Sequence, residues 1–169
     1  MPGMVIEIQP PSVARRGRVM RPQMVVSLPG DTVCSFVHCT IETAGGAPVG
    51  NIMQGGTQAN VPESINPPQQ STSRAPARRG RQYSIFFSLS IHEVGRFVIT
   101  VHANCTNEEG GQYVDEIKSE VVEVIDGKVA KTKLDKHQEK LMDKLDNAGF
   151  FRLLVSISSR GSLYWRPME

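Results

Sequence analysis

Arginines grouped in two stretches without acidic residues are the side chains of this sequence best suited to bind another molecule. The first stretch, residues 8–30, holds Arg15, Arg16, Arg18 and Arg21. The second stretch, residues 64–92, holds Arg74, Arg78, Arg79 and Arg81. A planar guanidinium group donates paired hydrogen bonds to phosphate oxygens or to a guanine edge, which the ammonium group of Lys does not. The pattern therefore predicts an anion-binding surface; the alternative interpretation is that these are solvated loop charges.

The charge of the chain is divided unevenly along its length. Residues 1–103 contain nine Arg, no Lys and five acidic residues, whereas residues 104–169 contain ten basic and twelve acidic residues. The first part thus carries a net charge of +4 and the second a net charge of −2, which together give the +2 of the whole chain. We expect the basic surface to lie on the first part, where guanidinium groups that fit phosphate oxygens and guanine edges suit a nucleic-acid partner.

Residues that could support catalysis or hold a metal do not occur in the required patterns. The sequence has no nucleophile elbow, no phosphate-cradling loop and no paired His on a helix, so we expect no enzyme activity and no cofactor. Cys34, His38, Cys39, His102 and Cys105 are zinc-ligand types, but no CxxC pair exists, and Cys34 and Cys39 fall on opposite faces of one predicted strand. We predict no metal site, and an odd number of cysteines predicts reduced thiols inside a cell.

Short alternating segments indicate a mainly β fold with one helix near the C-terminus. Strands are predicted over residues 4–8, 24–28, 33–41, 83–91, 96–103, 113–125 and 150–157, and a helix from a capping box at residues 132–135 to Gly149. Residues 83–91 and 96–103 are expected to form a hairpin, with Phe86 and Val98 as apolar residues on its exposed side and a possible partner surface. No aromatic residue lies between Val37 and Gln82, which predicts a flexible insertion over residues 54–82.

A length of 169 residues is sufficient for one domain with its own core, predicted over residues 1–157 with a tail over 158–169. The longest apolar runs have four or five residues, which predicts no membrane-spanning helix. The first residues lack a basic segment followed by an apolar one, so we expect no secretory signal.

Five landmarks in the same order resemble the velvet domain of fungal transcriptional regulators. Residues 5–10 with the Ala-Arg step at 14–15 resemble the family's glutamine-proline element, and residues 21–28 resemble its Arg-Pro element and the following strand. Pro48-Val49-Gly50 is similar to its Leu-Val-Gly position, and residues 134–149 resemble its terminal helix. The longest match is Phe86-Phe-Ser-Leu-Ser-Ile91 with Gly95-Arg96-Phe97. The sequence departs from the family at Ser88, at His92, where Arg or Lys is usual, and in a shorter basic loop.

The resemblance implies an immunoglobulin-like or Rel-like β-sandwich that binds DNA as a homodimer or as a heterodimer with another velvet protein. It also implies a nuclear protein with a cytoplasmic pool that controls sporulation, development and secondary metabolism, with a methyltransferase-like nuclear regulator as a further partner. The family's DNA contacts correspond to the first arginine stretch, residues 15–21. We expect Arg74, Arg78, Arg79 and Arg81 to make auxiliary phosphate contacts. The alternative function is a β-sandwich adaptor that binds another regulator and not DNA.

Overall fold

The computed structural model describes residues 3–55, 62–64 and 80–150, and the chain divides into two compact units, Met1–Lys133 and Leu134–Glu169. The described residues form eleven strands and one helix, named here in chain order. They are β1 (Val5–Ile8), β2 (Val13–Arg15), β3 (Met24–Leu28), β4 (Val33–Thr43), β5 (Met53–Gln54), β6 (Glu63–Ser64), β7 (Gln82–Phe86), β8 (Ser90–Ile91), β9 (Gly95–Thr106), β10 (Gln112–Lys118), β11 (Val122–Ile125) and α1 (Lys136–Asn147). The mainly β fold with a helix near the C-terminus agrees with the prediction.

The first sheet has the strand order β1-β3-β7-β6, and all its neighbouring strands are antiparallel. All five residues of the central strand β3 are buried, including the polar Ser27. The Ser27 hydroxyl donates to Glu7 Oε2 at 2.6 Å and accepts from Arg81 Nε at 2.8 Å, which satisfies this buried polar group. The strands predicted at residues 4–8 and 24–28 are confirmed as β1 and β3, and the structure pairs them with each other.

The second sheet has the order β10-β9-β11-β2, with β4 on the other side of β9. Phe97, Ile99, Val101 and Ala103 of β9 are buried, as their alternation predicted. Thr100, expected to face outward, is also buried, and its hydroxyl donates to Glu42 Oε1 at 3.0 Å. Alternation therefore identified the apolar face of this strand but missed one covered position on the other face.

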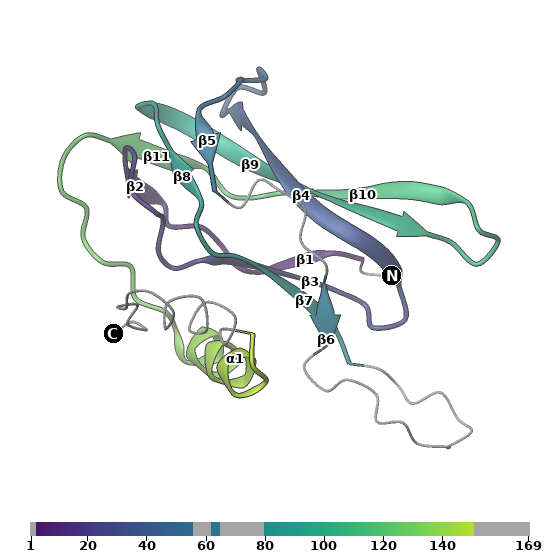
Figure 1. Cartoon of the computed structure of the whole chain (residues 1–169). Helices are drawn as coiled ribbons and strands as arrows, with labels where there is room; N and C mark the ends of the chain where they lie inside the picture. Colours follow the sequence, from purple (N-terminus) through teal and green to yellow (C-terminus); the bar gives the residue numbers. More distant parts are fainter. Residues whose placement is uncertain (1–2, 56–61, 65–79, 151–169) are drawn as a thin grey trace, which may run out of the picture. The chain divides into compact units, whose positions relative to one another are not determined.

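Both larger sheets contribute to one hydrophobic core, which is the arrangement of a β-sandwich (Figure 1). Met24 and Phe86 enter the core from the first sheet, and Val37 and Ile99 enter it from the second. Each large apolar side chain buried in this way contributes about 1.5–3 kcal/mol to folding. The sandwich therefore provides the rigid support on which the connecting loops are held.

The hairpin predicted from residues 83–91 and 96–103 does not form. The chain turns at Phe87 and Ser88, which separates β7 from β8; β7 pairs with β3 and β6, whereas β8 pairs with β5. Residues on both faces of β7 are buried, and Phe86 is only 1% exposed. Phe86 therefore presents no surface to a partner, in contrast to the prediction, whereas Val98 on β9 is half-buried.

Two short strands lie within or beside the insertion predicted over residues 54–82. β5 pairs with β8, and β6 pairs with β7, so the chain is tied to the sheets at both places. Residues 56–61 and 65–79 of the predicted insertion lie outside the described residues, as do residues 151–157 of the predicted last strand and the predicted tail 158–169.

The helix of the second unit begins three residues later than the sequence predicted. Asp135 is its N-cap: Gln138 N donates to Asp135 Oδ1 at 2.8 Å, and Asp135 N donates back to Gln138 Oε1 at 3.1 Å. Leu141 and Leu145 are buried on the predicted stripe, and the chain leaves the helix through Gly149 at a φ of 92°. No helix among the described residues is long and apolar enough to cross a membrane.

Candidate nucleic-acid interface

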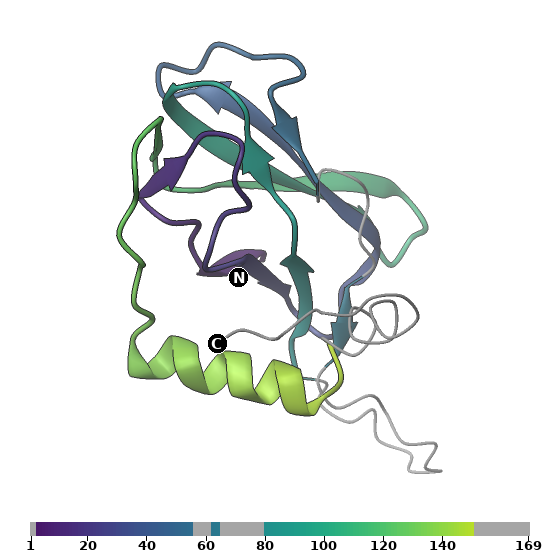
Figure 2. The same ribbon diagram turned by 60° about the vertical axis from the view of Figure 1, so that its left-hand side comes forward.

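The first arginine stretch lies where β2 ends at the edge of the second sheet. β2 pairs in parallel with β11, so that Arg15 is the partner of Ile125 at the ends of the two strands. We call residues 15–21 the arginine loop. Figures 1 and 2 show β2 beside β11, with the chain that follows it passing close to β8. The sequence predicted no strand between residues 8 and 24, so β2 is an element that it missed, and this strand fixes the position of Arg15.

Backbone hydrogen bonds hold the arginine loop against β11, against β8 and against the residue that precedes β8. Three N–H groups of the loop donate to carbonyl groups at 2.8 Å: Arg16 to Ile125, Gly17 to Ile91, and Met20 to Leu89. Within the loop, the Arg18 N–H donates to the Arg15 carbonyl at 3.1 Å. The Met20 side chain is 5% exposed and belongs to the hydrophobic core. The loop is thus anchored by its backbone and one buried side chain, while its arginines are exposed.

The four arginines of the loop differ in their pairing. Arg16 Nε lies 2.9 Å from Asp126 Oδ1, in the turn that follows β11. Among the described residues, Arg15, Arg18 and Arg21 have no carboxylate within ion-pair distance. Three exposed guanidinium groups therefore retain their full donor capacity for an external anion, whereas the fourth is used to join the loop to the β11 turn.

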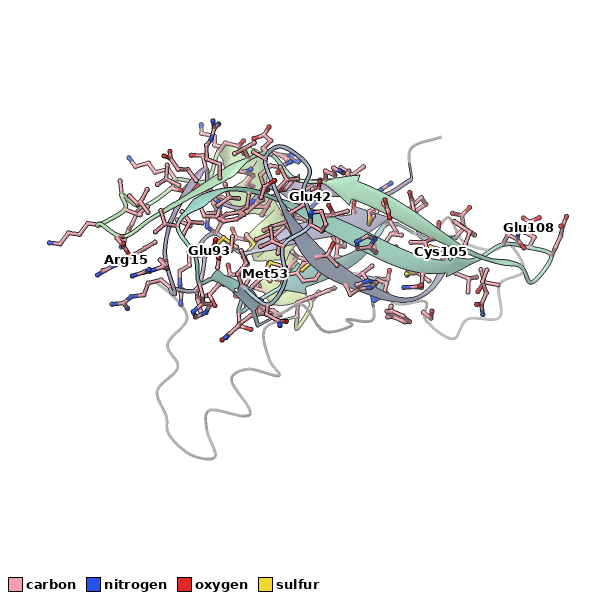
Figure 3. The ribbon with its side chains drawn as sticks, turned by 90° about the horizontal axis from the view of Figure 1, so that it is seen from above. Arg15, Glu42, Met53, Glu93, Cys105 and Glu108 are labelled. Atoms are coloured by element: carbon pink, nitrogen blue, oxygen red, sulfur yellow. The ribbon has the colours of Figure 1, made fainter. Side chains whose placement is uncertain are left out.

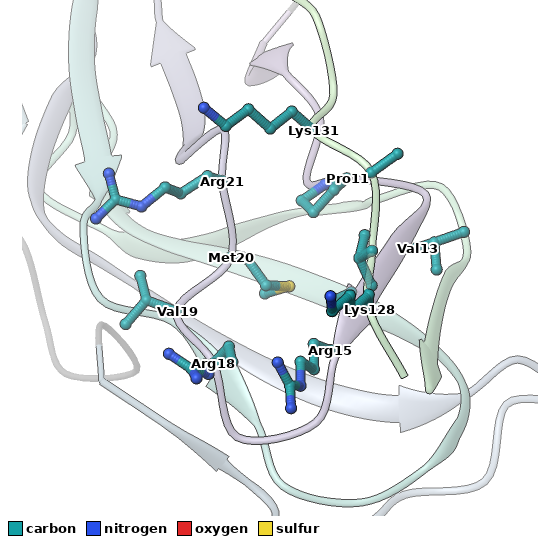
Figure 4. Close-up of a pocket in the computed structure, with 12 residues that line it drawn as sticks. Pro11, Val13, Arg15, Arg18, Val19, Met20, Arg21, Lys128 and Lys131 are labelled. Atoms are coloured by element: carbon teal, nitrogen blue, oxygen red, sulfur yellow. The ribbon is translucent and has the colours of Figure 1, made fainter. Parts of the chain in front are cut away.

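The arginine loop forms one wall of a cavity of about 330 Å³, and the other wall comes from residues 128–131, which we call the lysine segment. Five basic residues line the cavity, and none of its lining residues is acidic: Arg15, Arg18, Arg21, Lys128 and Lys131. Figure 4 shows Arg15, Arg18 and Lys128 toward one end and Arg21 and Lys131 toward the other, with Met20 between them. The lining also includes the apolar side chains of Val13 and Val129.

Lys128 and Lys131 were not predicted as site residues. They follow the turn at Asp126 and Gly127 directly after β11, and the parallel pairing of β11 with β2 brings them to the arginine loop. Parallel pairing joins segments that are distant in sequence, so no local pattern predicts it. The signal in the sequence is the series of basic residues at 128, 131 and 133, which lies within a part of net negative charge.

Carboxylates lie near the arginine loop but outside the cavity lining. Asp126 is paired with Arg16, and in Figure 3 Glu93 and Arg15 lie toward the same end of the view. Glu108 lies at the opposite end of the sheet in the same view. His92 adjoins the loop at Gly17, and its Nε2 lies 2.9 Å from the Ser90 hydroxyl.

Arg81, predicted as an auxiliary phosphate contact, makes several hydrogen bonds within the fold. Its Nε donates to the Ser27 hydroxyl at 2.8 Å, and one terminal nitrogen donates to the carbonyl groups of Gly3 at 2.8 Å and Ser27 at 3.2 Å. These bonds connect β1, β3 and the start of β7, so Arg81 stabilises the first sheet. Arg74, Arg78 and Arg79 lie outside the described residues.

The histidines and cysteines considered as zinc ligands are distributed along β4 and β9. Among the described residues no group of three or more His, Cys, Asp or Glu side chains could hold a metal ion. The His38 and His102 rings are stacked with a centroid distance of 4.8 Å. Burial, together with the neighbouring His102, lowers the pKa of His38 below its ordinary value. The two rings therefore pack against each other on the paired strands β4 and β9.

Burial keeps two of the thiols protonated at neutral pH. It raises the pKa of the Cys39 thiol to about 12, and burial next to Cys105 raises the pKa of the Cys34 thiol to about 12. Because the thiolate is the nucleophilic form, these residues have no activated thiol for catalysis.

The amino-acid sequence matches no protein-family model, and comparison with curated proteins finds no match. The resemblance to the velvet domain therefore depends on the landmark residues alone.

Proposed function

We propose that this protein is a sequence-specific DNA-binding transcriptional regulator whose arginine loop contacts the duplex. The observation that carries the proposal is the set of exposed, unpaired guanidinium groups at Arg15, Arg18 and Arg21 on a loop fixed by its backbone. A fixed loop loses little conformational freedom on binding, so more of the energy of its ionic contacts appears as affinity. Arginine also suits both the phosphate backbone and guanine edges in the major groove.

The biological setting of the proposal follows the velvet resemblance. The protein acts in the nucleus, with a cytoplasmic pool, in the control of fungal development and secondary metabolism. It binds DNA as a homodimer or with another velvet protein, because one short loop contacts only a few base pairs and a second half-site multiplies the discrimination. A methyltransferase-like nuclear regulator is a further proposed partner.

A second candidate function is an adaptor that binds another regulator and not DNA. Exposed apolar side chains at the start of β4 and on β10 favour a protein partner: Val33 is 64% exposed, Tyr113 44% and Val114 54%. These exposed side chains are compatible with the dimer of the first proposal as well. DNA binding and its sequence preference therefore distinguish the two functions.

The test is fluorescence anisotropy of the full chain with a randomised DNA pool and with a sequence enriched from it. We expect alanine at Arg18 to reduce affinity for the enriched sequence by about 1–3 kcal/mol if Arg18 contacts a base, and to weaken binding to every sequence equally if it contacts a phosphate. Arg96→Ala is the matched control, since Arg96 is an exposed arginine of β9 outside the cavity. If four phosphates are neutralised, affinity falls by about two decades between 50 and 200 mM salt. Weak binding without sequence preference that survives alanine at Arg15, Arg18 and Arg21 would contradict the proposal.

A further inference from the structure

The cavity between the arginine loop and the lysine segment combines features that select one kind of ligand. Its volume of about 330 Å³ is at the lower end of the ~300–1,000 Å³ range of ligand pockets. Its five charged lining residues are all Arg or Lys. Among the described residues, none of them has a carboxylate partner within ion-pair distance. Unpaired cations close together repel one another, so an anion between them lowers the electrostatic energy of the site.

The two walls of this cavity come from separate parts of the chain and are joined to each other. The Glu123 N–H donates to the Ser12 carbonyl at 2.8 Å just before β2, and the Arg16 N–H donates to the Ile125 carbonyl at 2.8 Å just after it. The Arg16–Asp126 ion pair adds a side-chain link at 2.9 Å. The point from which the lysine segment leaves β11 is therefore fixed relative to the arginine loop before any ligand binds, which favours preorganised recognition.

The chemistry of the lining points to a phosphate that is attached to a less polar group. Guanidinium and ammonium groups at Arg15, Arg18 and Lys128 can donate to phosphate oxygens. The apolar side chains of Met20 and Val129 line the same cavity and can contact the carbon atoms of a sugar. A phosphodiester of the DNA backbone supplies both parts.

We infer that Lys128 and Lys131 form, with Arg15 and Arg18, a binding site for a backbone phosphate of duplex DNA. This inference rests on the proposed function and deepens it, because it assigns part of the arginine loop to contact with the phosphate backbone of the DNA. The cavity fixes the position of the duplex, and sequence preference then depends on side chains outside the phosphate contact. The lysine segment was not identified as part of the site from the sequence.

The experiment compares the salt dependence of DNA binding by the full-length protein and the double variant Lys128→Ala/Lys131→Ala. Loss of this one phosphate contact reduces the slope of log K against log salt by about 1, so the loss of affinity between 50 and 200 mM salt becomes about three- to fourfold smaller. Affinity for the enriched and the scrambled duplex should fall by the same factor. The variant Lys128→Arg/Lys131→Arg keeps both charges and should retain the wild-type slope.

The matched control is Lys140→Ala/Lys144→Ala, which removes two exposed charges from α1 and leaves the cavity lining unchanged. An unchanged slope in the Lys128→Ala/Lys131→Ala protein, equal to that of this control, would overturn the inference. A change in the ratio of enriched to scrambled affinity would also overturn it, because a phosphate contact carries no sequence information. Circular dichroism confirms that each variant is folded.

A second measurement separates failure of the phosphate site from failure of the proposed function. Binding of inorganic pyrophosphate is followed by amide chemical shifts of the arginine loop and the lysine segment. If the wild type binds no duplex, the proposed function fails and the inference of a DNA phosphate site fails with it; pyrophosphate shifts that are lost in the lysine variant then assign the cavity to a free phosphate compound. If the wild type binds the duplex but pyrophosphate neither competes with it nor shifts these amides, only the inference fails.

Discussion

Substitution of Gly17 by Ala tests whether the arginine loop is held in one conformation before it binds. Gly17 has a φ of 76°, in the left-handed region that residues with a side chain rarely adopt. An added Cβ would meet only the His92 ring, at 3.7 Å from Nδ1, which is an ordinary contact distance. The cost of the substitution therefore comes from the backbone and not from a steric clash.

The expected magnitude combines two opposing contributions. The left-handed conformation costs Ala about 1–2 kcal/mol, whereas loss of glycine freedom in the unfolded chain returns about 0.4–1 kcal/mol. We expect the free energy of unfolding to fall by about 1 kcal/mol in a denaturant titration. Because the cations of the loop are unchanged, any accompanying fall in DNA affinity reports the displaced loop backbone and the loss of the hydrogen bond from Gly17 to Ile91.

Two comparison variants make this prediction refutable. Gly50 has no atom within 4 Å of an added Cβ and no positive φ, so Gly50→Ala should leave stability unchanged or slightly raised. Gly17→Asn should recover part of the loss, since Asn tolerates the left-handed region better than Ala. Equal stability of the Gly17→Ala and Gly50→Ala proteins would refute the argument that the loop is fixed in this conformation.

Two further predictions concern the sheet surface and the helix. Because burial and His102 lower the pKa of His38, the unfolded chain takes up a proton at this position more readily than the folded one, so stability is lost as the pH falls below the ordinary His value. His38→Gln should therefore flatten the decrease of the unfolding free energy between pH 7 and 5, and an equal decrease in both proteins would contradict this cause. Asp135→Ala should destabilise α1 by about 0.5–2 kcal/mol by removing its N-cap, measured as faster amide hydrogen exchange in the helix; unchanged exchange at Gln138 would exclude the capping role.

Local patterns predicted much of the fold because strand alternation depends on near neighbours. The buried face of β9 and the strand at residues 24–28 follow directly from the order of apolar residues. The same rule failed at Val33, whose spacing places it on one face with the buried Val37 but which is 64% exposed, because a register shift between Cys34 and Phe36 reverses the alternation. The turn at Phe87 was also missed, because Phe87 and Ser88 carry no Gly, Pro, Asn or Asp turn signal.

The candidate site was predicted in part, for the same physical reason. The four arginines at residues 15–21 are close in sequence and stay close in space, so composition was sufficient to select them. Their grouping with Lys128 and Lys131 depends on parallel pairing between β2 and β11, whose partners lie about one hundred residues apart. The ion pair of Arg16 could not be predicted for the same reason, because the pairing of β2 with β11 is what brings Asp126 into contact with Arg16.

Repulsion among its cations determines which interactions can hold the arginine loop in place. Two unit charges 4 Å apart in water repel by about 1 kcal/mol, so a cluster of unpaired cations does not hold a loop in place by itself. The Arg16–Asp126 pair is half exposed and contributes only about 0–1 kcal/mol. The loop is held instead by the backbone hydrogen bonds from Gly17 and Met20 to the β8 region and by the buried Met20 side chain. Anchors of this kind carry no charge, so they keep the cations concentrated without neutralising them, and an anionic ligand is left to relieve the repulsion.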